Sequence, residues 1–308
     1  MNTVKLCIDT DPGIDDALAL LLAFQLFDGR IVGITSVAGN QSVDKTTANA
    51  AKLLDLANQT IPLYRGAEGP LARTSIFAEE VHGITGIGKA VLPQSRRTIE
   101  KSPADEAIYE MACEYNGQFE IITLGPLTNI ALSLMKHRDL AAKIRKITMM
   151  GGGSYAGNVT PYAEFNFFAD AEAADIVFRS GIPIVMVGLD ATHNATITKT
   201  EATDALNEEN YTQFIALELF ESLFENHLYH SVNTSYMHDP LAVAAHYDPS
   251  LVSLSDAHVS IVCEPNEHYG QSLVEFYHDS PNAKVALDCD LDRFRELLFS
   301  TLTSYHEH

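Results

Sequence analysis

The sequence lacks long apolar runs and the features of an exported protein. No stretch of about 18 uncharged apolar residues, the length that a membrane-spanning helix needs, is present. Residues 1–5 lead directly into an apolar run, without the basic segment, apolar segment and cleavage site of a signal peptide. We therefore expect no membrane partner and a cytoplasmic location.

Cysteine is scarce and widely spaced. The chain has four cysteines and no C-x-x-C pair. They are Cys7, Cys113, Cys263 and Cys289. Isolated thiols of this kind stay reduced in a cytosolic protein, so we expect them to serve packing and not catalysis.

Positive charge is scarce as well. The 20 Lys and Arg residues face 41 Asp and Glu residues, which gives a formal net charge of -21. Such a surface repels phosphate polyanions, so we expect no nucleic-acid partner. The length of 308 residues and the hydrophobic share of 46% are enough for a sizeable core.

Strand-like apolar runs alternate with helical patterns along most of the chain. The predicted strands are residues 4–9, 31–37, 119–124, 146–150 and 183–188. The predicted helices are residues 15–27, 42–58, 103–115, 126–137 and 171–180. This alternation is typical of an α/β fold in which helices cover a mainly parallel sheet.

The rest of the chain departs from this alternation. Residues 65–100 are rich in glycine and are predicted to form a long loop near the site. The later segments are predicted as helix over 199–228, loop over 231–237, helix from Asp239, strand over 284–288 and helix over 291–299. Because no repeat or linker interrupts the chain, we predict one domain over residues 1–308, with helical and loop insertions.

The most informative segment runs from Asp9 to Asp16. It places four carboxylates within eight residues, directly after the apolar run 4–8. A strand would deliver these acids to its carboxyl end, where open α/β sheets bind ligands. Two carboxylates about 4 Å apart repel each other by roughly 4 kcal/mol at an effective dielectric constant near 20. The segment therefore needs a cation, shared protons or wide separation, and is a candidate metal or acid–base site.

Simpler explanations of this segment are less complete. An EF-hand that starts at Asp9 needs an oxygen ligand at its fifth position and Glu at its twelfth, which are Gly13 and Leu20 here. A phosphotransferase D-x-D loop leaves the Asp15-Asp16 pair unexplained. Capping of a helix N-terminus explains one acid but not four.

Polar groups also follow the ends of the other predicted strands. They are Asn40, the Leu124 carbonyl exposed by Gly125-Pro126, Asn158, Glu164 and Asn166. His238 and Asp239 open a later predicted helix, with Pro240 at a favourable early position. Each alone is also compatible with a turn or a helix cap. None of these segments contains Lys or Arg, which a phosphate site would normally supply. Acids and amides without positive charge favour a neutral polyol and a hard, oxygen-ligated cation.

At this point the chain resembles the inosine–uridine-preferring nucleoside hydrolases. The matching motifs are residues 9–17, Val37-Ala38-Gly39-Asn40, His82-Gly83, residues 125–131, Met150-Gly151-Gly152-Gly153, Ala163-Glu164-Phe165-Asn166 and His238-Asp239-Pro240. The resemblance implies a Rossmann-like open sheet, one Ca²⁺ per subunit and a homodimer or homotetramer. It also implies hydrolysis of the N-glycosidic bond of a ribonucleoside, to free base and ribose, in nucleoside salvage.

The resemblance also implies roles for individual residues. The expected calcium ligands are Asp11, Asp16, the Leu124 carbonyl and Asp239, and Asp11 is also the expected water-activating base. The expected ribose ligands are Asp15, Asn40, Met150, Asn158, Glu164 and Asn166. His238 is expected to face the nucleobase and to assist its departure, and His82 to lie in a mobile loop that closes over the substrate.

The pocket for the leaving base is less defined. Residues 224–238 contain Phe224, His227, Tyr229, His230 and Tyr236. A pair such as Tyr229 or Tyr236 with a histidine could pass a proton to the base, but these side chains could equally pack a helix end. His238 favours pyrimidine nucleosides or inosine as substrates. A calcium-dependent nucleoside-binding protein and a phosphatase are the alternative functions.

Overall fold

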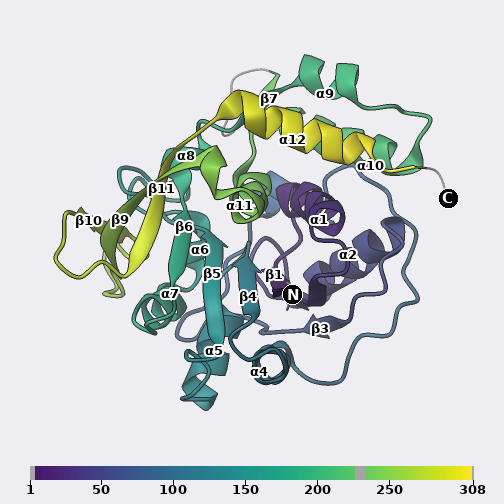
Figure 1. Cartoon of the computed structure of the whole chain (residues 1–308). Coiled ribbons are helices and arrows are strands. Elements are labelled where there is room, and N and C mark those ends of the chain that lie inside the picture. Colours follow the sequence, from purple (N-terminus) through teal and green to yellow (C-terminus); the bar gives the residue numbers. More distant parts are fainter. Residues whose placement is uncertain (1–3, 226–232, 307–308) are drawn as a thin grey trace.

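The computed structural model describes residues 4–225 and 233–306 and has a nine-stranded sheet at its centre (Figure 1). The strand order is β10-β9-β11-β6-β5-β4-β1-β2-β3. The strands from β3 to β11 pair in parallel, and β9 and β10 add an antiparallel edge. This architecture confirms the predicted α/β class and the Rossmann-like, mainly parallel sheet.

The strands and helices have the following bounds. The strands of the main sheet are β1 Lys5–Thr10, β2 Ile31–Ser36, β3 Leu63–Arg65, β4 Phe119–Thr123, β5 Ile144–Met150, β6 Ile184–Val187, β9 Val252–Ile261, β10 Ser272–Phe276 and β11 Ala283–Cys289. A small antiparallel sheet joins β7 Thr196–Thr198 and β8 Thr234–Tyr236. The helices are α1 Ile14–Leu26, α2 Val43–Leu56, α3 Glu79–His82, α4 Ala104–Glu114, α5 Thr128–Lys136, α6 Phe165–Ala169, α7 Ala171–Phe178, α8 Leu189–Thr192, α9 Lys199–Ala205, α10 Tyr211–Glu225, α11 His238–Tyr247 and α12 Leu291–Thr303.

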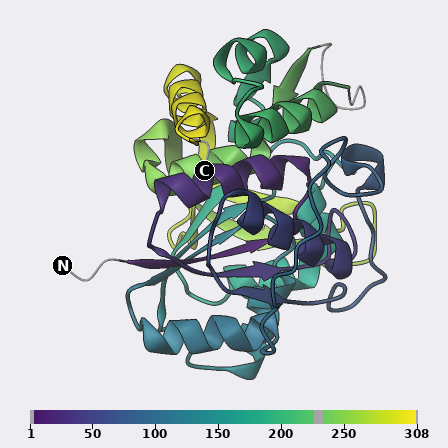
Figure 2. The same cartoon turned by 90° about the vertical axis from the view of Figure 1, so that its right-hand side faces the viewer.

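Helices cover both faces of the sheet, as Figure 2 shows. On one face α4, α5 and α7 pack over the strands. On the other face α1, α2 and α11 pack on the sheet, and α10 and α12 form a further layer over α1. Helix α1 is therefore enclosed, and every side chain from Ile14 to Phe24 is buried. An almost uniformly apolar helix is stable in such a position because none of its faces meets water. Among the described residues, no helix is long and apolar enough to cross a membrane.

The strand order places the candidate site. From β1 the chain moves through β2 and β3 toward one edge, and from β4 through β5 and β6 toward the other. Ligands of open α/β sheets bind at such a switch point, outside the carboxyl ends of the strands. Asp11 follows β1 and Leu124 follows β4, so the switch point brings these two residues to the same crevice.

The predicted strands and helices of the parallel core are all present, with bounds that shift by a few residues. Other predictions need correction. In the described part of the chain, the predicted loop 231–237 contains strand β8 and the predicted loop 65–100 contains α3. The predicted helical region 199–228 is divided into α9 and α10, and its residues 226–228, like residues 231–232, lie outside the described residues. Strands β3, β7, β9 and β10 were not predicted. Strand β9 alternates buried and exposed positions because it lies near an edge, so it lacks the continuous apolar run of the central strands.

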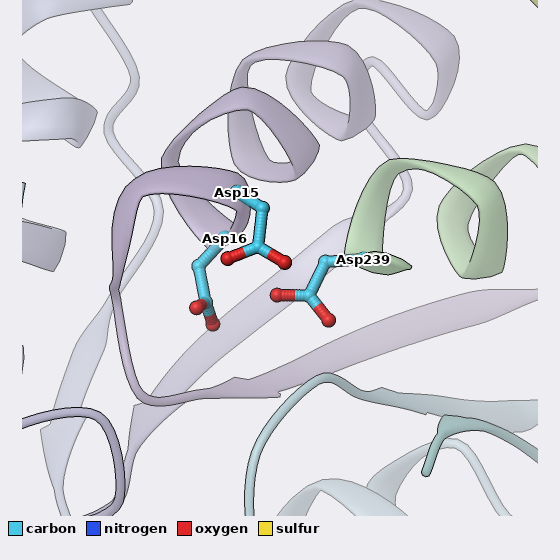
Figure 3. Close-up of side chains that lie close together, drawn as sticks. All are labelled: Asp15, Asp16 and Asp239. Atoms are coloured by element: carbon cyan, nitrogen blue, oxygen red, sulfur yellow. The ribbon is translucent and has the colours of Figure 1, made fainter. Parts of the chain in front are cut away.

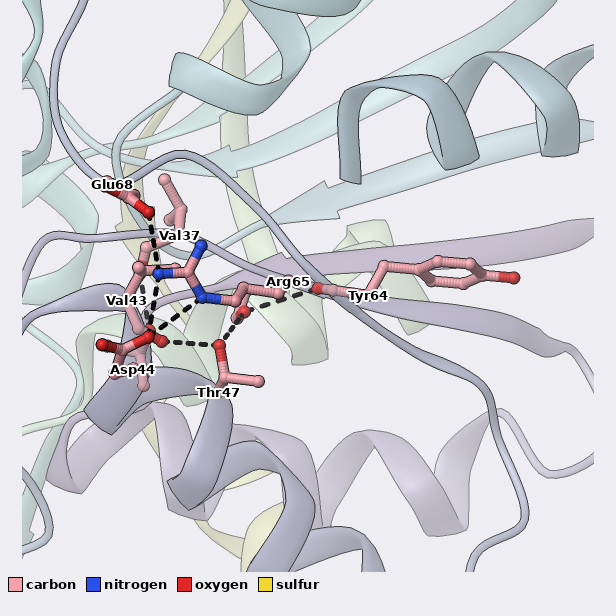
Figure 4. A network of polar contacts seen from close by, with 9 residues as sticks. Val37, Val43, Asp44, Thr47, Tyr64, Arg65 and Glu68 are labelled. Carbon is pink, nitrogen blue, oxygen red and sulfur yellow. Dashed lines mark hydrogen bonds and ion pairs between the residues drawn. The ribbon is translucent and has the colours of Figure 1, made fainter. Parts of the chain in front are cut away.

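Ionic and polar contacts hold the start of the segment 65–100 (Figure 4). The Arg65 guanidinium lies 2.8 Å from a carboxylate oxygen of Asp44 and 3.0 Å from one of Glu68. Beside it, the hydroxyls of Ser36 and Thr47 are 2.7 Å apart and join β2 to α2. Exposed ion pairs stabilise little on their own. Here they fix where the chain leaves β3 and begins the segment over the site.

Candidate active site

Three carboxylates converge where two helices begin (Figure 3). Asp15 and Asp16 lie in the first turn of α1, and Asp239 lies in the first turn of α11. All three are buried, and each offers an oxygen within 4.8 Å of the others. The positive ends of the two helix dipoles point at this cluster and offset part of the repulsion among the acids. Such an all-oxygen set can hold a hard cation.

Asp16 is fixed by the turn that precedes α1. One of its oxygens accepts a hydrogen bond from the Thr10 hydroxyl at 2.6 Å. The other accepts from the Gly13 backbone N–H at 3.0 Å and from the Asn40 side-chain amide at 2.9 Å. The turn Asp11-Pro12-Gly13 thus leads into α1 and also supplies a backbone N–H that orients the Asp16 carboxylate.

Asp11 lies beneath the cluster and is completely buried. Its Oδ2 accepts a hydrogen bond from the Asn40 backbone N–H at 2.6 Å, whereas its Oδ1 has no hydrogen-bond partner in the described part of the chain. Gly39 and Gly125 approach so closely that a Cβ on either would overlap the Asp11 carboxylate. A buried oxygen without a partner is costly unless it binds a proton or a cation.

Burial and mutual repulsion shift the pKa values of these acids upward. Desolvation is the main cause for all four. It raises the pKa of Asp15 to about 6. The pKa of Asp11 rises further because of the charge on Asp16, and that of Asp239 because of the charges on Asp15 and Asp16. Without a counter-charge the cluster therefore favours protonated carboxyls, as the crowding in the sequence predicts.

A cavity of about 900 Å³ opens above the cluster. This volume is typical of a small-molecule site. The predicted site residues that line it are Asp15, Asn40, His82, Leu124, Met150, Asn158, Glu164, Asn166, Tyr236, His238 and Asp239. Asp11 and Asp16 lie below its surface, and Tyr229, His227 and His230 are outside the described residues. No Lys or Arg is among the described lining residues, which agrees with the charge pattern of the sequence.

Glu164 organises one wall of the cavity. It precedes α6, and its carboxylate accepts backbone hydrogen bonds from Asn166 at 2.8 Å, Gly152 at 2.9 Å and Phe167 at 3.2 Å. Burial nevertheless raises its pKa to about 7. Gly152 can donate in this way because it adopts a positive φ of 70°, where a Cβ would also overlap the Phe167 ring. The glycine run after β5 is therefore a structural requirement of this wall.

Two amides continue the same wall. The Asn166 side-chain amide donates to the Leu124 carbonyl at 2.8 Å and to the Met150 carbonyl at 3.2 Å. The Asn158 side-chain Oδ1 accepts a hydrogen bond from the Phe165 backbone N–H at 2.9 Å. The Leu124 carbonyl keeps a second lone pair, since a carbonyl oxygen has two. It can therefore still ligate a cation.

His82 closes the cavity from the segment 65–100. Its Nδ1 accepts a hydrogen bond from the Ile14 backbone N–H at 3.0 Å, so it caps the N-terminus of α1. Burial lowers the pKa of His82 to about 4. A ring that accepts at Nδ1 carries its proton at Nε2 when neutral. His82 is thus held as a neutral imidazole beside the acids.

A row of polar side chains at the start of and along α2 holds the segment around His82. The Gln41 side-chain amide donates to the Gly83 carbonyl at 2.8 Å, and the Lys45 ammonium to the Ile84 carbonyl at 2.7 Å. One turn further, the Asn49 amide donates to the Thr85 carbonyl at 2.9 Å and to the Pro12 carbonyl at 3.2 Å. The spacing of four residues puts Lys45 and Asn49 on one face of α2, and Gln41 lies just before the helix begins.

Aromatic and imidazole rings form another wall of the cavity. The ring centroids of His193 and Tyr236 are 4.6 Å apart, and His238 lies 5.8 Å from His193 and 5.9 Å from Tyr236. The His238 Nδ1 is 2.8 Å from the Thr192 hydroxyl. Thr192 and His193 were not among the predicted site residues, although both follow β6 at the same edge of the sheet as the others. Their place after a predicted strand is the signal that could have identified them. Phe224, in contrast, is buried in the hydrophobic core.

Known proteins resemble this chain over nearly its whole length. A family model described as inosine-uridine preferring nucleoside hydrolase matches residues 6–296. A curated relative, pyrimidine-specific ribonucleoside hydrolase RihA of Escherichia coli O81 (strain ED1a), is 38% identical over 310 residues, covering 98% of this chain and 99% of the relative.

Two solved structures share the fold closely. The plant nucleoside hydrolase PpNRh1 has a TM-score of 0.90 and 30% identity, and the match covers 98% of this chain and 99% of that chain. A purine-preferring ribonucleoside hydrolase from Gardnerella vaginalis has a TM-score of 0.90 and 28% identity, with 97% and 98% coverage.

Proposed function

The chain belongs to the inosine-uridine preferring nucleoside hydrolase family, and we propose that it hydrolyses the N-glycosidic bond of pyrimidine ribonucleosides, and of inosine as a second substrate. Within the family it is a ribonucleoside hydrolase, a glycosidase that acts on N-glycosyl bonds. The observation that carries the proposal is a cavity with buried acids at its base, amides along one wall and no basic residue among its described lining residues. The identity to pyrimidine-specific relatives supports the pyrimidine preference.

We propose Ca²⁺ as the cation, held by Asp11, Asp16, Asp239 and the Leu124 carbonyl. The donors are all oxygen, and the Asp11 Oδ1, which has no hydrogen-bond partner in the described part of the chain, fits a bound cation. Asp15 also lies in the cluster. It reaches the cavity surface, whereas Asp16 does not, so we assign Asp15 to a ribose hydroxyl. When bound, the ion supplies positive charge that polarises water and sugar hydroxyls at the cluster.

The side chains supply the rest of the reaction. Asp11 takes a proton from the attacking water, whose oxygen bonds to C1′ of the ribose. As the bond from C1′ to the base breaks, the sugar gains positive charge, which the carboxylates of the cluster stabilise. Asn40, Met150, Asn158, Glu164 and Asn166 hold the ribose. The negative charge of Glu164 would disfavour a 5′-phosphate and so selects nucleosides over nucleotides.

The opposite wall, with Tyr236 and His238, receives the base. His82, in the segment 65–100, covers the part of the cavity that holds the ribose when this segment closes over the substrate. We propose nucleoside salvage as the physiological role. A cytoplasmic location, a homodimer or homotetramer, and a single domain over residues 1–308 stay predictions.

A substrate panel tests the proposal. Uridine, cytidine, inosine and uridine 5′-monophosphate are incubated with the protein in calcium buffer, and free ribose is measured as reducing sugar. We expect the fastest release from the two pyrimidine nucleosides, slower release from inosine and almost none from the monophosphate. Binding of uridine without ribose release would instead support a nucleoside-binding protein.

A further inference from the structure

A buried hydroxyl lies directly behind His238. Thr192 is the last residue of α8, which follows β6 at the carboxyl edge of the sheet, and its side chain is fully buried. Its Oγ1 is 2.8 Å from His238 Nδ1, where α11 begins. His238 lines the cavity. The threonine itself does not line the cavity, so it can act on a substrate only through the histidine.

The hydrogen-bonding needs of Thr192 decide which nitrogen of the neutral His238 ring carries the hydrogen. Within residues 4–225 and 233–306, the Thr192 hydroxyl has no other hydrogen-bond acceptor. If Nδ1 carried the proton, the hydroxyl would accept it and its own hydrogen would stay buried without a partner, which is unfavourable. If the hydroxyl donates to Nδ1, both groups are satisfied. The neutral ring then carries its hydrogen on Nε2.

Ring contacts restrict the His238 plane from a second direction. His193 meets His238 edge to face, with centroids 5.8 Å apart and an interplanar angle of 60°. Tyr236 lies 5.9 Å away at 53°. Such tilted contacts are favourable arrangements for aromatic rings. Together with the bond to Thr192 they hold the ring in one orientation on the cavity wall.

We propose that Thr192 is a positioning residue that keeps His238 in its Nε2–H tautomer, so that the ring offers a hydrogen-bond donor to the departing nucleobase. This inference rests on the proposed function. As the C1′–N bond breaks, its electron pair moves onto the base, and the N–H donor stabilises the resulting anion while the hydrogen stays on His238. The base then takes its proton from solvent water, and the proton of the attacking water goes to Asp11.

The leaving group distinguishes this role from a purely structural one. Uridine releases its base as a poorly stabilised pyrimidine anion. In contrast, p-nitrophenyl β-D-ribofuranoside releases nitrophenolate, a stable anion that needs little stabilisation by a hydrogen-bond donor. Loss of one hydrogen-bond donor to the negative charge that develops in a transition state commonly slows a reaction about 10²–10³-fold. With calcium present, we expect Thr192→Val to lower kcat for uridine by about 10- to 100-fold, with a small change in KM. We expect its rate with the nitrophenyl riboside to fall by less than about threefold.

Two further variants complete the test. Thr192→Ser keeps the hydroxyl and is expected to restore most of the uridine activity. Thr200→Val changes an exposed threonine of α9, away from the cavity, and should behave as wild type with both substrates. Unchanged uridine turnover in Thr192→Val, or an equal loss with both substrates, would overturn the inference.

Histidine NMR provides a readout that does not depend on turnover. In ¹⁵N-histidine-labelled wild-type protein, the resonance that disappears in His238→Gln should have the shifts of an Nε2–H imidazole. An Nδ1–H pattern would overturn the inference even if Thr192→Val did not fold. Absence of ribose release by wild type from every nucleoside tested would instead overturn the proposed function, and the NMR result would still report the tautomer.

Discussion

At the scale of single residues, Asp9 and Asp11 have different roles although both are completely buried. Asp9 lies within the sheet, and its Oδ1 accepts hydrogen bonds from the Thr35 hydroxyl at 2.5 Å and the Asn129 amide at 2.7 Å. Asp11 lies beyond the strand, its Oδ2 accepts from the Asn40 backbone N–H, and the nearby charge on Asp16 acts on it. The other oxygen of each acid has no hydrogen-bond partner among the described residues. The spacing of two residues therefore separates an acid held within the sheet from the acid that we propose as the base.

Replacing Asp11 tests its chemical role. Asp11→Asn keeps the shape of the side chain but removes the proton acceptor and one proposed calcium ligand. We expect kcat for uridine to fall by at least about 10²- to 10⁴-fold, the usual effect of losing a general base. Steady-state kinetics on purified protein measure this. Activity within a few-fold of wild type would contradict the assignment.

Asp9→Asn is the matched control, with a distinct pH signature. Burial raises the pKa of Asp9 from 3.8 to about 7. The protonated form is thus favoured by folding, and the stability it contributes is full below pH 3.8 and is lost as pH rises through 7. Asparagine does not ionise. We expect Asp9→Asn to keep most activity and to gain stability relative to wild type in urea unfolding between pH 5 and pH 8.

The acids and amides that line the cavity after strand ends could be predicted from the sequence, because such residues share one edge of a parallel sheet. Thr192 and His193 also follow a predicted strand and fit the same rule, but neither is an acid or an amide, so they were not selected. The three-carboxylate cluster contains Asp15 beside Asp16 and Asp239. The assignment of Asp11 to the metal and of Asp15 to the ribose therefore stays a prediction, which spacing in the sequence alone does not decide.

At the scale of secondary structure, α2 controls the segment that carries His82. Asn49→Leu removes the hydrogen bonds to the Thr85 and Pro12 carbonyls with little change in volume. Because Asn49 does not line the cavity, we expect KM for uridine to rise several-fold and kcat to change little. Amide hydrogen exchange of residues 76–88 should become faster.

Lys52→Ala, on the same helix, is the control for this variant. Its ammonium makes no hydrogen bond or ion pair within residues 4–225 and 233–306, so both KM and exchange should match wild type. Equal behaviour of the Asn49 and Lys52 variants would show that α2 does not hold the segment.

Central strands were predictable where edge strands were not. Strands β1, β4 and β6 are buried on both faces, so their apolar runs are continuous. Strands β9 and β10 expose part of their residues and have mixed sequences. Strand β8 has three residues and exists only because β7 pairs with it. Pairing of this kind depends on tertiary structure and has little local signal.

At the scale of the whole molecule, the buried acids make stability depend on pH and on the cation. Burial raises the pKa of Asp15 to about 6 and that of Glu164 to about 7. Their contribution to stability is therefore present below about pH 4, near their unfolded pKa values, and is lost as pH rises through 6 to 7. A cation that binds the folded site offsets this loss.

Thermal unfolding measures this linkage. We expect the Tm of chelator-treated protein to fall between pH 5 and pH 8, and millimolar CaCl₂ to raise it most at the higher pH. Potassium chloride at equal ionic strength controls for screening. A calcium effect that is equal at pH 5 and pH 8 would contradict the account.

The most direct test of the central claim is the rate of uridine hydrolysis as calcium is returned to metal-free protein. The account predicts almost no ribose release after chelation and full recovery on titration, with saturation near one Ca²⁺ per chain. Uridine hydrolysis that persists unchanged in the metal-free protein, or that no amount of calcium produces, would contradict it.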